Sequence, residues 1–77
     1  MDGDILVGVS GGTYKYKDKI QKYAAEYGDP VVGGAGKPPA RVRWDSGAKM
    51  WLMQYKVWKK LVEHYPDIER KCTMTPL

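Results

Sequence analysis

The pattern of apolar and polar residues predicts a strand, a helix, a hairpin and a second helix, in that order. Residues 4–10 are nearly continuous in apolar side chains, as in the central strand of a sheet. Apolar side chains then recur at helical spacing over residues 14–27, with Thr13 as a candidate N-cap. Gly28 and Pro30 follow where a helix commonly ends. This part of the chain is therefore predicted to form one strand and one amphipathic helix.

The hairpin is predicted from alternation on both sides of a short polar turn. Polar and apolar residues alternate over residues 41–44, and residues 49–53 supply the return strand. Residues 45–48 make the turn, in which we expect Gly47 to adopt a positive φ, because glycine has no Cβ to oppose it. An isolated hairpin is marginally stable in water, so this one needs a helix against one face.

The second helix is predicted over residues 55–65, with one apolar arc and with Pro66 at its end. The phase of the hairpin and of this arc places Trp44, Trp58 and Leu61 toward each other. We expect these three side chains to be buried together in the core.

The remaining segments are predicted to be irregular. Residues 29–39 are rich in glycine and proline and predict a long loop, with a short extended piece at its start. Residues 72–77 predict a C-terminal tail. The 77-residue chain is therefore expected to hold a single α+β domain over residues 1–71. Its order would be β-α-β-β-α, with a three-stranded sheet and two helices on one face.

Composition limits the chemistry and the location that we expect. Cys72 is the only cysteine, so no disulfide within the chain and no cysteine–histidine zinc cluster is expected. The first residues lack a basic segment and a long apolar run, so we expect neither a signal peptide nor a membrane span. We therefore expect an intracellular protein, cytoplasmic or nuclear, with no membrane partner.

Catalytic and cofactor sites are not indicated by the sequence. His64 is the only histidine and falls on the polar side of its helix, and no nucleophile lies near it in sequence. The turn Ser10-Gly11-Gly12 resembles the SGGxDS signature of the PP-loop ATP pyrophosphatases, but Tyr14 and Lys15 stand where that signature has Asp and Ser. A tight strand-to-helix turn is the favoured interpretation, and nucleotide binding stays the third alternative. We expect no enzyme activity, no cofactor and no metal.

Basic and aromatic residues give the strongest functional pattern, in a chain of net charge +4. Arg41 and Arg43 project from one side of a strand about 6–7 Å apart, close to the phosphate spacing of an extended polynucleotide. Lysines neutralise phosphates, and an exposed tryptophan can stack on bases. The predicted nucleic-acid-binding residues are Lys15, Lys19, Lys22, Arg41, Arg43, Lys49 and Trp51.

Residues 43–51, RWDSGAKMW, resemble the hairpin of HARP domains, which has the form (R/K)-aromatic-D-x-x-x-K-x-W. HARP domains accompany annealing helicases that act on branched or partly single-stranded DNA, and similar hairpins occur in modules attached to primases and phage proteins. The resemblance implies the order strand, helix, hairpin, helix, and a single-stranded or junction DNA partner, with RNA as a further possibility.

A protein partner is the main alternative to nucleic acid. Trp51 and Met53 lie on one side of their strand, and Met50 and Leu52 lie on the other. Two apolar faces predict either a second layer or an exposed patch. Trp51, Met53 and the loop of residues 29–39 could then form the epitope of a small interaction or inhibitor domain, encoded by a virus or a mobile element.

Overall fold

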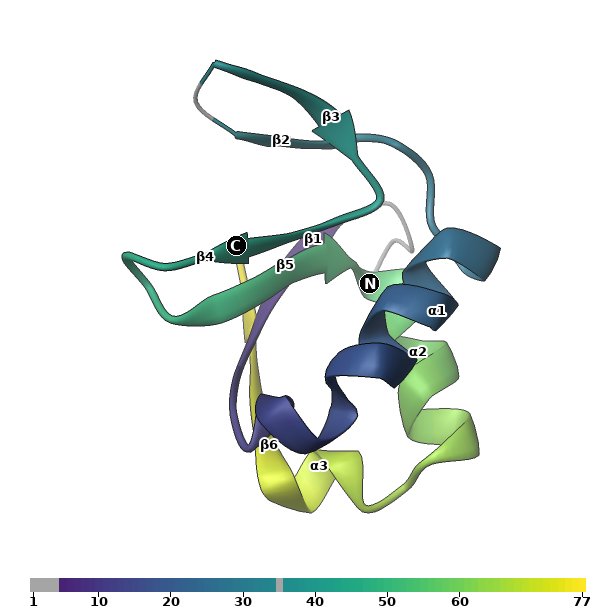
Figure 1. The fold of residues 1–77 in the computed structure, drawn as a ribbon. Coiled ribbons are helices and arrows are strands. Elements are labelled where there is room, and N and C mark those ends of the chain that lie inside the picture. The colour runs from purple at the N-terminus through teal and green to yellow at the C-terminus, as the bar shows by residue number, and fades with distance from the viewer. Residues whose placement is uncertain (1–4, 35) are drawn as a thin grey trace.

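The computed structural model describes residues 5–34 and 36–77. Its elements, in chain order, are β1 (Leu6–Gly11), η1 (Thr13–Tyr16), α1 (Lys17–Tyr27), β2 (Val32–Gly34), β3 (Lys37–Ala40), β4 (Val42–Asp45), β5 (Met50–Gln54), α2 (Tyr55–His64), α3 (Ile68–Lys71) and β6 (Cys72–Pro76) (Figure 1). The short η1 is a 3-10 helix that leads directly into α1. The expected mixture of helices and antiparallel strands is confirmed.

The main sheet has four strands in the order β4-β5-β1-β6, and every neighbouring pair is antiparallel. Our expectation of a three-stranded sheet is therefore wrong. The fourth strand is Cys72–Pro76, in the segment for which the sequence predicts a tail. Its pairing with β1 supplies hydrogen-bond partners to the second edge of that strand, which a three-stranded sheet would leave open. Without β2 and β3, the chain follows the split β-α-β-β-α-β topology.

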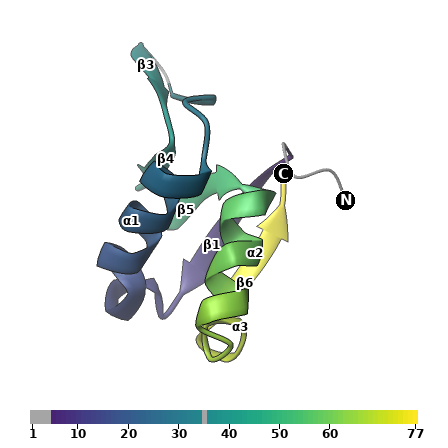
Figure 2. The same ribbon diagram turned by 90° about the vertical axis from the view of Figure 1, so that its right-hand side faces the viewer.

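Both long helices lie on one face of the sheet (Figure 2). Val7 and Val9 of β1 point into this layer and are fully buried, together with Ile20 of α1 and Leu61 of α2. Gly8 lies between the two valines and faces the other way, where an added Cβ would overlap the sulfur of Met50. The alternation along β1 thus separates a helix-covered face from an open face.

The turn between β4 and β5 differs from the prediction. The side-chain oxygen Oδ1 of Asp45 accepts hydrogen bonds from the backbone N–H groups of Gly47 (3.0 Å) and Ala48 (3.2 Å). Lys49, and not Gly47, has the positive φ, at 55°. The aspartate side chain replaces part of the backbone bonding of the turn, so the left-handed residue comes later in the chain.

The segment predicted as a loop contains the second sheet, a β2–β3 hairpin that stands beside β4 (Figure 1). Arg43 holds it in place: its Nε donates to the carbonyl of Val32 (3.4 Å), and a terminal nitrogen donates to the carbonyl of Pro38 (2.5 Å). Arg41 donates to the carbonyl of Gly28, at 3.1 Å. Both arginines therefore bond to the backbone of the segment that precedes them.

Candidate functional site

Trp44 and Trp51 form a cross-strand pair. They stand directly opposite each other on β4 and β5, with ring centroids 5.4 Å apart and planes tilted by 58°. Trp51 is also opposite Val9, which is buried under the helices, so all three side chains lie on the helix-covered face. The pair therefore runs from the core toward the edge of the sheet.

The exposure of Trp44 overturns one prediction. Trp58 and Leu61 are buried as expected, at 5% and 0% exposed, but Trp44 is 45% exposed. The alternation of residues along the strand predicted the correct face for Trp44, the face covered by the helices. However, β4 is an edge strand, so Trp44 has a neighbouring strand on one side only. Trp51 covers that side of the ring, and the other side faces solvent.

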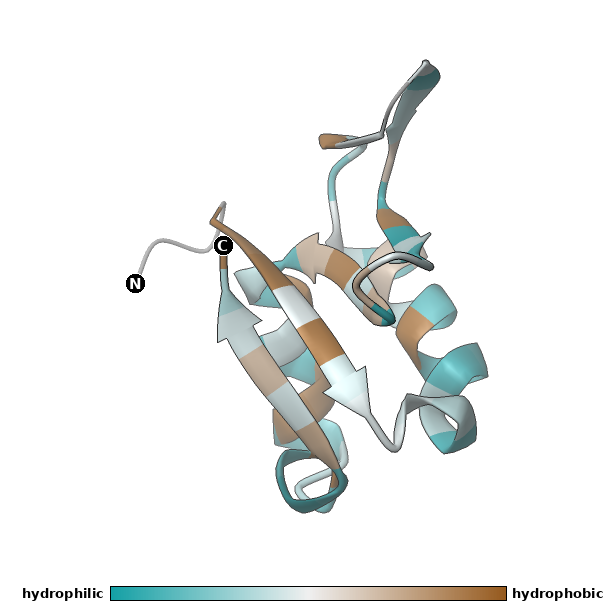
Figure 3. Ribbon diagram, turned by 90° about the vertical axis from the view of Figure 1, so that its left-hand side faces the viewer, coloured by the Kyte–Doolittle hydropathy of each residue, from teal (hydrophilic) through white to brown (hydrophobic). Residues whose placement is uncertain are grey.

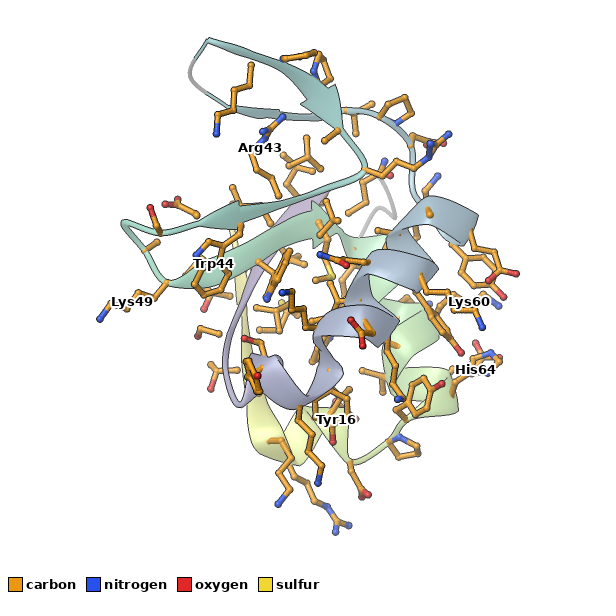
Figure 4. The ribbon with its side chains drawn as sticks, in the orientation of Figure 1. Tyr16, Arg43, Trp44, Lys49, Lys60 and His64 are labelled. Carbon is orange, nitrogen blue, oxygen red and sulfur yellow. The ribbon has the colours of Figure 1, made fainter. Side chains whose placement is uncertain are left out.

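An open groove of about 590 Å³ begins at this tryptophan pair. Its second wall comes from the end of β1, from η1 and from the start of α1, and its lining residues are Gly11, Thr13, Tyr14, Lys17, Trp44, Lys49 and Trp51. Tyr14 is 91% exposed. Lys49 has a left-handed backbone conformation, and its side chain projects from the tip of the β4–β5 hairpin beside Trp44 (Figure 4).

The charge of the groove is positive. Among the residues that the structure describes, neither the ammonium group of Lys17 nor that of Lys49 makes a hydrogen bond or ion pair. No acidic residue is among the described residues that line the groove. Two ammonium groups are therefore available to an anionic ligand next to a mainly aromatic surface.

The predicted binding residues are divided between several places. Lys49 and Trp51 line the groove, whereas the other five do not. Lys19 places its Nζ over the ring of Tyr65, 5.3 Å from the centroid. Arg41 and Arg43 bond to backbone carbonyls, and Lys15 and Lys22 are exposed outside the groove.

Sequence reasoning missed Trp44, Lys17 and Tyr14 as groove residues. The sequence does contain a signal for Trp44. Residues 45–50 connect it to Trp51, and a hairpin closed across these residues puts the two rings opposite each other. Lys17 and Tyr14 carry no such signal, because their place depends on how α1 packs against the hairpin.

Figure 3 shows the face of the main sheet that turns away from the helices. Along the four strands, its described residues include Gly8, Ser10, Arg43, Leu52, Thr73 and Thr75, and no aromatic residue belongs to it among those described. Some four-stranded sheets bind RNA by stacking bases on aromatic residues of the open face. That mode of binding is not available here, so the aromatic groove at the edge is the better candidate.

His64, the turn after β1 and Cys72 each have a structural role or environment that explains them without a functional site. His64 is exposed, with its ring edge-on to Tyr23 at 5.4 Å. In the turn after β1, the N–H of Gly12 donates to the carbonyl of Lys71 (2.9 Å), so this donor is not available to a phosphate. Burial raises the pKa of the Cys72 thiol.

Neither a cluster of metal-binding side chains nor a membrane-spanning helix is found among the described residues. Residues 5–34 and 36–77 contain no group of three or more His, Cys, Asp or Glu side chains placed to hold a metal ion. Over the same residues, no helix combines the length and the hydropathy needed to span a bilayer.

Comparison with known proteins adds no relative. No family model, no curated protein and no solved structure matches this chain.

Proposed function

We propose that this protein is a non-enzymatic nucleic-acid-binding module whose ligand is single-stranded or branched DNA, with RNA as a second possible ligand. The observation that carries the proposal is the half-exposed Trp44, paired with Trp51 and flanked by two lysines that have no partner among the described residues. The resemblance of residues 43–51 to HARP hairpins supports the same class of ligand, because these residues include Trp44, Lys49 and Trp51.

The proposed binding combines stacking with charge neutralisation. A base that stacks on an aromatic side chain contributes about 1–3 kcal/mol. Lys17 and Lys49 would neutralise the phosphates on either side of that base. The bases of a duplex are already stacked on each other, so a single strand or a fork presents the free base that Trp44 requires.

The test measures the affinity of a labelled oligothymidylate by fluorescence anisotropy at several salt concentrations. Trp44→Ala should weaken binding by about 5–150-fold, which is the loss of one stacked base. Lys49→Ala should lower the salt slope by about 0.7, the value for one phosphate contact on a single strand.

The matched control is Lys22→Ala, which removes the same charge from an exposed position outside the groove. It should bind as the wild type does. Equal losses in Lys22→Ala and Lys49→Ala would show that the effect of charge on binding is not specific to the groove. If the wild type shows no affinity below about 100 μM at low salt, where non-specific binding is already expected, the proposed function is wrong.

A protein-interaction or inhibitor domain stays the second candidate, on altered grounds. Met53 is fully buried, so the epitope of Trp51 and Met53 that we expected cannot form. The groove of Trp44, Trp51 and Tyr14 is, however, the kind of aromatic surface that also binds proline-rich peptides. Salt separates the two functions, because phosphate binding weakens steeply with salt and apolar peptide binding does not.

A further inference from the structure

A second groove lies on the other side of the edge strand, between the β2–β3 hairpin and β4. Its volume is about 470 Å³. Gly33, Gly34 and Lys37 line it from the hairpin, and Arg43 and Asp45 line it from β4. Trp44 lines both this groove and the groove of the candidate site. The two grooves therefore meet at one tryptophan on the edge of the sheet.

The hairpin wall of the second groove is open and basic. A Cβ added at Gly33 would meet no atom within 4 Å, so the glycine leaves space there. Lys37 is exposed, and its side chain makes no hydrogen bond or ion pair with another residue of the described chain. Asp45 is the only acidic residue among the described lining residues, and its Oδ1 already accepts the two N–H bonds of the turn.

Arg43 fixes the position of this wall. It is half-buried, and its bonds to the carbonyls of Val32 and Pro38 join the hairpin to β4. Lys37 is paired with Gly34 across the hairpin, so the same contacts that position the hairpin also position the lysine. The second groove thus carries a basic residue on a hairpin whose backbone is bonded to β4.

We infer that the binding path continues over Trp44 into the second groove, so that the ligand is an extended single-stranded polynucleotide that crosses the edge strand. This inference rests on the proposed function. Each groove has a lysine of its own, and Trp44 is a lining residue of both. A mononucleotide would occupy one groove only, whereas a longer strand reaches Lys49 on one side and Lys37 on the other.

The length of the oligonucleotide tests this arrangement. Affinities would be measured for oligothymidylates of increasing length with the wild type, Lys37→Ala and Lys49→Ala. Wild-type affinity should rise with length until both grooves are filled. Lys37→Ala should match the wild type for the shortest oligonucleotides that bind and fall about fivefold behind at 0.1 M salt for the longer ones. Lys49→Ala should weaken binding at every length.

Charge reversal gives a second variant at the same exposed position. Lys37→Glu should weaken the binding of the longer oligonucleotides more than Lys37→Ala does. The melting temperature of the protein should not change. If the wild type binds but Lys37→Ala equals it at every length, or loses affinity equally at all lengths, the continued path is overturned. If the wild type binds no oligonucleotide, the proposed function itself fails.

Discussion

Asp29 connects the segment between α1 and β2 to the end of β5 and to the first turn of α2. Its backbone N–H donates to Oε1 of Gln54 (2.6 Å), and its carboxylate accepts from Nζ of Lys56 (2.6 Å). Gln54 ends β5 and is 1% exposed, while Asp29 follows α1 and precedes β2. The hydrogen bond from Lys56, and after it the bond from Gln54, lowers the pKa of Asp29 below its ordinary value of 3.8.

This lowered pKa predicts how stability depends on pH. The folded state binds a proton at Asp29 less readily than the unfolded chain does, so the carboxylate stabilises the fold above the unfolded pKa. That stability is lost as the pH falls below about 4 and through the folded pKa. Asp29→Asn should therefore lower the melting temperature at pH 7, and the difference from the wild type should close in acid.

Thermal melts between pH 7 and pH 2.5 would measure this difference. Glu63→Gln is a suitable control, because Glu63 makes an exposed ion pair with Lys60 at 3.5 Å, and such pairs contribute little. A gap between Asp29→Asn and the wild type that stays constant down to the lowest pH would show that the carboxylate charge is not the cause.

At the scale of elements, the sequence predicted those helices and strands that depend on the local pattern of apolar and polar residues. The two long helices, the first strand and the β4–β5 hairpin lie close to the predicted ranges, because period and turn residues are local properties. The strands β3 and β6 were missed, and of β2 only a short extended piece at Val31 and Val32 was predicted. Cys72–Pro76 becomes a strand by pairing with β1, which is distant in sequence, and Val32–Gly34 is too short to show a period.

In the candidate site too, some residues could be predicted from local sequence and others could not. Lys49 and Trp51 could be chosen from the hairpin alone, since turn and register are local. Lys17 reaches the groove only through the packing of α1, and the partners of Arg43 lie five and eleven residues away. Such contacts follow from tertiary structure, so a basic pattern in the sequence did not separate structural arginines from available lysines.

The β2–β3 hairpin should depend on Arg43 without controlling the rest of the fold. Hydrogen bonds to a charged group contribute about 1.5–3 kcal/mol. Arg43→Ala should therefore speed exchange of the backbone amides in β2 and β3 by about tenfold or more, while the amides of β1 and β5 keep their protection.

Arg43→Lys tests whether charge alone is sufficient. Lysine keeps the positive charge but lacks the planar fork that reaches two carbonyls, so it should restore only part of the protection. Unchanged hairpin exchange in Arg43→Ala would mean that the hairpin is held by other contacts.

At the scale of the whole molecule, the helix layer covers the core and leaves Trp44 exposed at the edge of the sheet. The buried cluster joins β1, β5, α1 and α2, and it includes Trp58, whereas Trp44 stands at the far edge of the same face. The two tryptophans therefore have the same chemistry and different surroundings. Truncating each of them to alanine separates stability from function.

Trp58→Ala should cost about 3–5 kcal/mol, because it leaves a cavity in the core. That is a large part of the ~5–15 kcal/mol available to a small domain. Trp44→Ala should cost clearly less than Trp58→Ala, since nearly half of its surface is already exposed and its removal leaves no enclosed cavity. Urea denaturation of both variants, beside oligonucleotide binding by Trp44→Ala, makes the comparison. A folded Trp44→Ala that no longer binds would place the function at the edge of the sheet. Equal destabilisation by the two substitutions would instead make Trp44 part of the core, and its loss of binding would then follow from loss of folding.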